Sequence, residues 1–144
     1  MNDPYNLKRF LEAQRSVYEG ALAELRRGCK SGHWMWFVFP QVVGLGHSTT
    51  AHHYAIGSLA EARAYLREAI LGPRLIACTE AVNAVEGRSA HDIFGWPDEM
   101  KFCSCMTLFE AAAPENSAFK IALRKYFGDN RDSTTLAKLK EISP

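Results

Sequence analysis

Apolar residues recur at three- and four-residue steps along the first part of the chain, as on one face of an α-helix. Asp3 is a suitable N-cap, and Pro4 suits a first helical turn. Arg26 and Arg27, followed by Gly28, are typical of a helix C-terminus. The pattern predicts one long amphipathic helix over residues 4–27, of about six turns. Its buried face consists of Leu7, Phe10, Leu11, Gln14, Val17, Tyr18, Ala21, Leu22 and Leu25.

The next segment, residues 31–46, is apolar on every side. Trp34 to Phe39 has the composition of a strand, but without alternation the periodicity does not decide between strand and helix. No other convincing strand is present to pair with it. We therefore expect a short, fully buried helix that Pro40 ends.

Helical patterns return after residue 48. Their boundaries carry capping and stop signals. The predicted elements are a helix from near Thr49, a helix from Ser58 with Glu61 at capping-box spacing, a break at Gly72 and Pro73, a helix from Pro73 to Gly87, a short turn from Ser89 to Phe94, a corner at 95–97, a helix from Pro97 to about Ala113, a helix from Ser117 to Phe127 stopped by Gly128, and a last helix capped by Asp132 or Ser133. The fold class is all-α, a single compact domain over residues 1–144 with about six or seven helices.

Composition narrows the class of protein. The chain has 144 residues, 47% of them hydrophobic and 23% charged, which indicates a globular domain rather than a disordered or membrane-embedded one. The net charge of +1 gives no overall field that would attract nucleic acid or an anionic membrane.

The four cysteines match neither a zinc-binding nor a redox spacing. We expect Cys29, Cys78, Cys103 and Cys105 to be free thiols acting as small core residues, as in a reducing compartment. The first residues lack the charged-then-apolar layout of a secretion signal. The expected location is cytoplasmic.

The first candidate for chemistry is the aromatic and glycine segment, residues 33–48. Aromatic faces with polar neighbours are suited to stacking a planar ring such as a nucleobase. The turn from Gly44 to Ser48 precedes a helix, so its backbone N–H groups could face an anion. The alternative is that Trp34, Phe37 and Phe39 are core residues and the glycines only make a turn.

The second candidate is the helix that follows Pro97. At helical spacing Asp98, Lys101 and Ser104 lie near one face, with Cys105 beside them. Lys101 among apolar residues could act as a base or nucleophile. Alternatively, it pairs with Asp98 on a wet surface, where the pair contributes little and has no chemical role.

Histidine and cysteine offer weaker candidates. The five histidines show no metal-binding spacing, and His52 and His53 would point about 100° apart on a helix. His33 borders the aromatic block, which makes it the best placed histidine for acid–base chemistry. Cys103 and Cys105 have no adjacent base, which favours a structural role.

Ordered blocks along the chain resemble an uncharacterised, mainly bacterial family of about 140 residues, a domain of unknown function. The blocks are Ser31 to Gln41, Gly44 to Ser48, Tyr54 to Ile56, Glu61-Ala62 with Tyr65-Leu66, Leu71 to Leu75, and Phe94 to Asp98 with Lys101, Ser104 and Thr107 to Phe109. The resemblance implies an all-α fold and carries no catalytic assignment. Some members are labelled calpastatin, but those inhibitors are long, polar and disordered, unlike this apolar chain.

A fainter likeness, in residue types rather than in alignable motifs, is to small all-α proteins that cleave N-glycosidic bonds in ADP-ribose-containing molecules. It suggests a substrate class. We therefore predict a pocket between residues 33–48 and helix 97–113 for a small anionic, nucleotide- or ADP-ribose-like ligand. If the protein is an enzyme, the predicted activity is metal-independent N-glycosidic hydrolysis, with no cofactor.

Within that prediction the candidate catalytic residues are Asp98, Lys101 and His33. The predicted ligand-binding residues are Trp34, Trp36, Phe37, Gln41, Gly44, Gly46, Ser48, Tyr54, Ser104 and Thr107. The alternative functions are a non-catalytic interaction module or homo-oligomer that uses exposed aromatics, or two blocks that are simply core.

Overall fold

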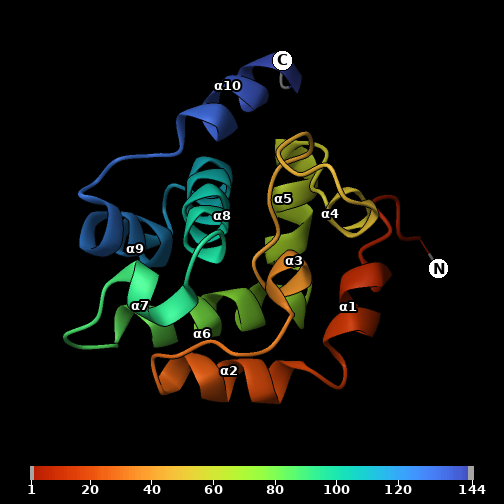
Figure 1. Cartoon of the computed structure of the whole chain (residues 1–144). Helices are drawn as coiled ribbons and strands as arrows, with labels where there is room; N and C mark the ends of the chain where they lie inside the picture. Colours follow the sequence, from red (N-terminus) through yellow and green to blue (C-terminus); the bar gives the residue numbers. More distant parts are fainter. Residues whose placement is uncertain (1, 143–144) are drawn as a thin grey trace.

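The structure, a computed structural model, describes residues 2–142, and this part of the chain is all-helical. Its single β-bridge joins Val42 and Ile56. Figure 1 shows the helices stacked around a central α8. The helices are α1 (Lys8–Gln14), α2 (Tyr18–Arg26), α3 (Met35–Val38), α4 (Thr49–His53), α5 (Leu59–Arg67), α6 (Leu71–Asn83), α7 (Ala90–Phe94), α8 (Asp98–Ala112), α9 (Ser117–Phe127) and α10 (Ser133–Ile142). The all-α class is confirmed, with ten helices in the described residues rather than six or seven.

The prediction of one long N-terminal helix over residues 4–27 is wrong, because the chain turns after Gln14 and forms α1 and α2. The two helices run in different directions (Figure 1), and α1 packs on α3 while α2 packs on α6. Gln14 is buried at the turn, where its side-chain amide donates to the Phe37 carbonyl at 2.7 Å. Hydrophobic periodicity did not reveal the turn. The buried positions of α1 and α2 follow one another at the spacing expected of a single continuous helix.

The start of that helix also differs from the prediction. The Asp3 carboxylate does accept backbone hydrogen bonds, from Leu7 at 2.8 Å and from Lys8 at 3.1 Å. However, Asn6 adopts a left-handed conformation (φ 53°), so the regular helix begins only at Lys8.

The aromatic block forms the predicted short helix, α3. Met35 and Val38 face the core, and the Phe39 ring meets Phe102 of α8 edge-on, with centroids 5.1 Å apart. This contact attaches the block to the centre of the molecule.

Helix α8 lies at that centre and packs against α5, α7, α9 and α10. Every side chain from Phe102 to Phe109 is buried. A helix covered on all sides needs apolar or small residues all round, as this one has. Thr107 satisfies its hydroxyl within the helix by donating to the Cys103 carbonyl at 2.8 Å.

Most other boundaries follow their predicted caps. Ser58 accepts from Glu61 N at 3.0 Å, and Ser89 and Asp92 form a reciprocal capping box. Asp132 accepts from Thr135 N at 2.9 Å at the start of α10. The predicted break at Gly72 and Pro73 is wrong, because both residues lie in the first turn of α6, which begins at Leu71 and ends at Asn83. Among residues 2–142, the helices are too short or too polar for any to cross a membrane.

Gly72 marks a close approach between α5 and α6. A Cβ at this position would lie 2.0 Å from the carbonyl oxygen of Leu66, a backbone atom that has little freedom to move. Gly20 on α2 is the matched case, since a Cβ there meets nothing within 4 Å.

We therefore expect Gly72→Ala to lower the free energy of unfolding by about 3 kcal/mol, through overpacking against backbone. Gly20→Ala should be neutral or stabilising by up to about 1 kcal/mol, because it improves helix propensity. Urea unfolding of both variants measures this. Equal stability of the two would show that α5 and α6 can separate at little cost.

Candidate functional site

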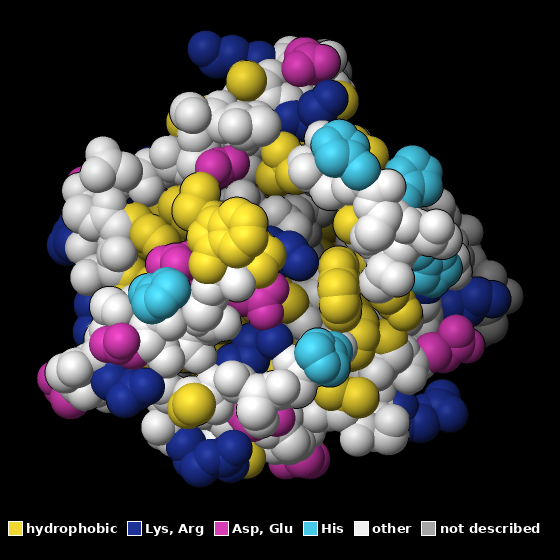
Figure 2. Space-filling model, viewed as in Figure 1, with side chains coloured by type: hydrophobic (Ala, Val, Ile, Leu, Met, Phe, Trp, Pro, Cys, Tyr) yellow, Lys and Arg dark blue, Asp and Glu magenta, His cyan; other side chains and the backbone are white. Residues whose placement is uncertain are grey.

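Two adjoining hollows open on one face of the molecule, with volumes of about 530 and 430 Å³. The first lies along residues 41–55, and the second lies between this segment, α8 and the start of α10. Figure 2 shows this face hollowed in the middle, with hydrophobic side chains on two sides, Lys or Arg within and histidines over α4. Residues shared by both hollows are Trp36, Gln41, Gly46, His47, Ser48 and Ala51.

Many of the predicted site residues meet here. Of the candidates from the aromatic segment and α8, those that line one or both hollows are Trp36, Gln41, Gly44, Gly46, Ser48, Tyr54, Lys101 and Ser104. They come from two segments about 50 residues apart in the sequence, and both segments line the second hollow.

The other predicted residues lie elsewhere. Trp34 is only 2% exposed and belongs to the core, and Thr107 is fully buried inside α8. Phe37 lies behind Tyr54, with ring centroids 5.3 Å apart. His33 is exposed and lines neither hollow.

Asp98 lies next to the second hollow and takes part in two ion pairs. Its carboxylate lies 2.7 Å from Lys30 Nζ and 3.6 Å from Lys101 Nζ. The Lys30 side chain is only 7% exposed, whereas that of Lys101 is 25% exposed and lines the hollow. Two cations share one anion, and the closer pair is the buried one. Lys101 is therefore the lysine of these ion pairs that presents its positive charge to the second hollow.

Lys101 also lies over the ring of Trp36, with Nζ 4.9 Å from the ring centroid. Such a cation–π contact is stabilising by about 0.5–1 kcal/mol at exposed sites. It holds the two predicted segments together at the mouth of the site.

Glu24 fixes the segment that leads into α3. Its carboxylate accepts from Ser31 N at 2.7 Å, Gly32 N at 2.9 Å and Trp34 Nε1 at 3.0 Å. Burial acts to raise the pKa of Glu24, but these three hydrogen bonds outweigh it and hold the pKa below its usual value.

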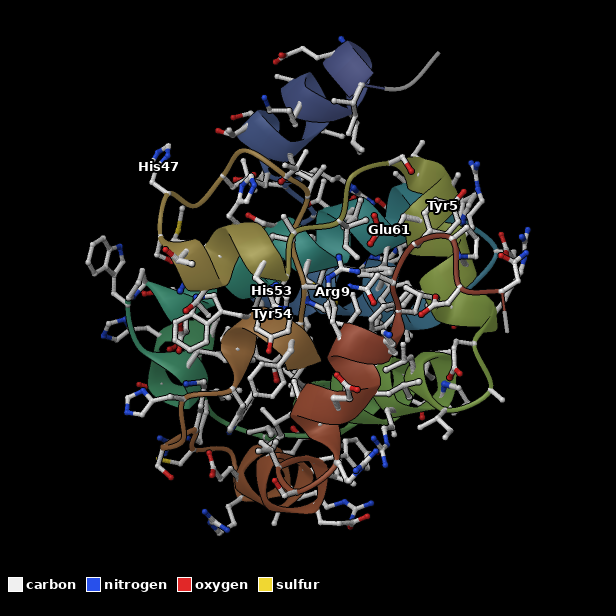
Figure 3. All side chains as sticks on the ribbon, turned by 90° about the vertical axis from the view of Figure 1, so that its right-hand side faces the viewer. Tyr5, Arg9, His47, His53, Tyr54 and Glu61 are labelled. Atoms are coloured by element: carbon white, nitrogen blue, oxygen red, sulfur yellow. The ribbon has the colours of Figure 1, made fainter. Side chains whose placement is uncertain are left out.

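Arg9 fixes the other end of the segment. It donates to the carbonyls of His53 at 2.8 Å and Ala55 at 2.9 Å and pairs with the buried Glu61 at 2.8 Å. Glu61 also accepts from Gly57 N at 2.9 Å. Figure 3 shows Arg9 between Glu61 and His53, with Tyr54 beside them and His47 at the outer edge of the loop. The loop that walls the first hollow is thus anchored to α1 and α5.

The sequence profile of a family described as "Protein of unknown function (DUF1810)" matches residues 4–139. The chain belongs to this family. The structure of the conserved hypothetical protein Rv1873 from Mycobacterium tuberculosis is 54% identical, with a TM-score of 0.95, and the match covers 96% of this chain and 99% of that one. None of the curated proteins matches the sequence.

The predicted membership of an uncharacterised family is confirmed. The description of the DUF1810 family and that of Rv1873 name no activity. These relatives therefore do not establish a function for this family member.

Sequence reasoning did not assign a site role to five polar residues that line the hollows: His47, Thr49, His52, Asp132 and Thr134. The two histidines lie in or next to the glycine-rich turn, and that closeness was the available signal. Asp132 was interpreted only as a helix cap. Its place at the site comes from tertiary structure, since its backbone N–H donates to Thr107 Oγ1 at 2.9 Å.

The cysteines fit a structural role in three of four cases. Burial raises the pKa of the Cys78 thiol to about 12 and that of Cys103 to about 11, and it also raises the pKa of Cys105. These thiols are protonated at neutral pH and are poor nucleophiles. Cys29 is exposed, which corrects the expectation that all four are core residues.

Arg9→Met leaves Glu61 buried without its cation. We expect a loss of about 3 kcal/mol in the free energy of unfolding, because an unpaired buried charge remains. Lys8→Met, at the exposed neighbouring position, should change stability by less than about 0.5 kcal/mol. Urea denaturation compares the two, and a small effect of Arg9→Met would contradict the anchoring role.

Glu24→Gln tests the second anchor through pH. The lowered pKa means that the folded state holds its carboxylate ionised more strongly than the unfolded state does. Its stabilisation is present above the ordinary pKa of 4.5 and is lost as pH falls through the folded value. We expect the variant to be less stable than the wild type at about pH 7 and the gap to narrow toward about pH 3.

Unfolding followed by circular dichroism across that range measures the gap. Glu12→Gln is the matched control, since Glu12 is exposed on α1 and the substitution should change stability by less than about 0.5 kcal/mol. A gap for Glu24→Gln that does not change with pH would contradict the role of the three hydrogen bonds.

Proposed function

We propose that this protein binds a small anionic ligand with a planar ring, of nucleotide or ADP-ribose type, in the two hollows. The observation that carries the proposal is the placement of Lys101 Nζ 4.9 Å from the Trp36 ring centroid, with both residues lining the second hollow. An aromatic face and an accessible cation are the two groups that such a ligand needs.

The surroundings support the same ligand class. Volumes of about 530 and 430 Å³ lie within the range of small-molecule sites. Gln41 lines both hollows and offers an amide that can donate to and accept from the edge of a base. Stacking of one base on an aromatic ring contributes about 1–3 kcal/mol.

The geometry supports ligand binding more strongly than it supports cleavage with Asp98 or His33 as the acid or base. Asp98 is engaged with two lysines and His33 lies outside the hollows, so neither is placed as the acid or base of an N-glycosidic hydrolase. Lys101 remains the candidate catalytic residue that lines the second hollow. Metal-independent hydrolysis is the reaction to assay once a ligand is found.

A second candidate function is protein interaction, as a module or homo-oligomer. It rests on Trp96, which is 76% exposed, and Met100, which is 54% exposed and lines the second hollow. Exposed aromatics of this kind are typical of interfaces. Sedimentation of the wild type and of Trp96→Ala separates this function from ligand binding by a monomer.

We also propose a cytoplasmic location. All four cysteines are free, and a reducing compartment keeps thiols in that state.

Titration calorimetry with AMP and with ADP-ribose tests the binding proposal. Trp36→Ala should weaken binding about 10- to 100-fold through loss of stacking, while Trp36→Phe keeps most of it. Lys101→Met should also weaken binding and reduce its dependence on salt. Lys120→Met, at an exposed position on α9, is the matched charge control and should bind as the wild type does.

No binding of either compound by the wild type, up to millimolar concentration, would overturn the proposal. Wild-type affinity in folded Trp36→Ala would overturn the assignment of the stacking surface. Thermal melting of each variant establishes that it is folded.

A further inference from the structure

The second hollow contains a carboxylate as well as a cation. Asp132 and Thr134 line it from the start of α10, and Lys101 and Ser104 line it from α8. In a site for a simple anion, a carboxylate would repel the ligand and weaken its binding. The pairing of the two charges indicates a ligand with an anionic part and a part rich in hydroxyl groups.

Asp132 contacts α8 further along the helix than the position of Lys101. Asp132 is docked beside Thr107 by the 2.9 Å hydrogen bond from its backbone N–H to Thr107 Oγ1. Thr107 follows Lys101 by six residues, which is about 9 Å of helix. Across residues 2–142 the ion pairs do not include one between Lys101 and Asp132. We therefore expect Lys101 and Asp132 to bind different groups of one ligand.

The Asp132 carboxylate is held rigidly. Its Oδ2 accepts from Thr135 N at 2.9 Å and from Thr135 Oγ1 at 2.6 Å, and Thr135 is fully buried. A carboxylate has about four acceptor positions, so two donors do not exhaust it. The remaining acceptor positions of the carboxylate are therefore already oriented in the absence of a ligand.

Carboxylates are used by nucleotide-binding proteins to accept hydrogen bonds from ribose hydroxyls, and they exclude a phosphate at the same position. We propose that Asp132 accepts the 2′- and 3′-hydroxyls of a ribose, so the ligand is a ribonucleotide with a free diol. This inference rests on the proposed function, because it assigns the sugar position of the same site.

Calorimetric comparison of AMP with 2′,3′-dideoxy-AMP tests the inference. We expect the wild type to prefer AMP by about tenfold or more, as for hydrogen bonds to a charged group. Asp132→Asn keeps the helix cap, since Asn caps as well as Asp, and removes the charge. The preference should fall by about threefold or more in this variant, since only neutral hydrogen bonds then remain.

Asp129→Asn is the matched control. Asp129 lies three residues away, is 54% exposed at its side chain and has a left-handed backbone that Asn tolerates. This variant should keep the full preference for AMP.

Equal binding of both nucleotides by the wild type would overturn the inference while the proposed function stands. Full preference retained in Asp132→Asn would also overturn it. Absence of binding for both nucleotides in the wild type would instead overturn the proposed function, and the inference with it. The wild-type comparison needs no variant, so the test does not depend on how Asp132→Asn folds.

Discussion

The guanidinium of Arg9 is the interaction on which the shape of the site depends. Its nitrogens donate to four carbonyl oxygens, those of Tyr5, Asn6, His53 and Ala55, and to the Glu61 carboxylate. A buried cation is tolerated only when it is fully paired, and this one is. Residues 41–57 contain only the short α4 and one β-bridge, so they cannot hold their own shape. The hydrogen bonds of Arg9 hold this segment in place, as backbone hydrogen bonds hold the helices.

The aromatic block is both core and site, and the reason lies in how α3 is fixed. Glu24 holds the indole of Trp34 inward, and Met35 and Val38 are buried beside it. Successive residues of a helix point about 100° apart. Once Trp34 and Met35 face the core, Trp36 is left half-buried at the mouth of the hollows. Trp34 is therefore a core residue, whereas Trp36 lines the hollows. Trp96 lies on the exterior.

Local signals made much of this fold predictable. The caps at Ser58, Ser89 and Asp132 satisfy backbone groups within a few residues, so sequence alone locates them. The turn after Gln14 is different, because it depends on α1 and α2 packing against separate partners. The same limit holds for the site. Trp36, Gln41 and Ser48 lie close in sequence and were found, whereas Asp132 reaches the hollow only through its contact with Thr107.

The charge of the site shows how a buried residue can set the chemistry of an exposed one. Read from the sequence, Asp98 and Lys101 are one turn apart and would neutralise each other. In the folded protein Lys30, which is far from both in sequence, lies 2.7 Å from the Asp98 carboxylate. The desolvation of Lys30 is offset by that carboxylate and by the carbonyl of Gly32. Because Asp98 lies closer to Lys30, Lys101 is only partly neutralised, and the proposed anionic ligand would meet its remaining charge. The degree to which Lys101 is neutralised is thus set beneath the surface, by a lysine that lines neither hollow.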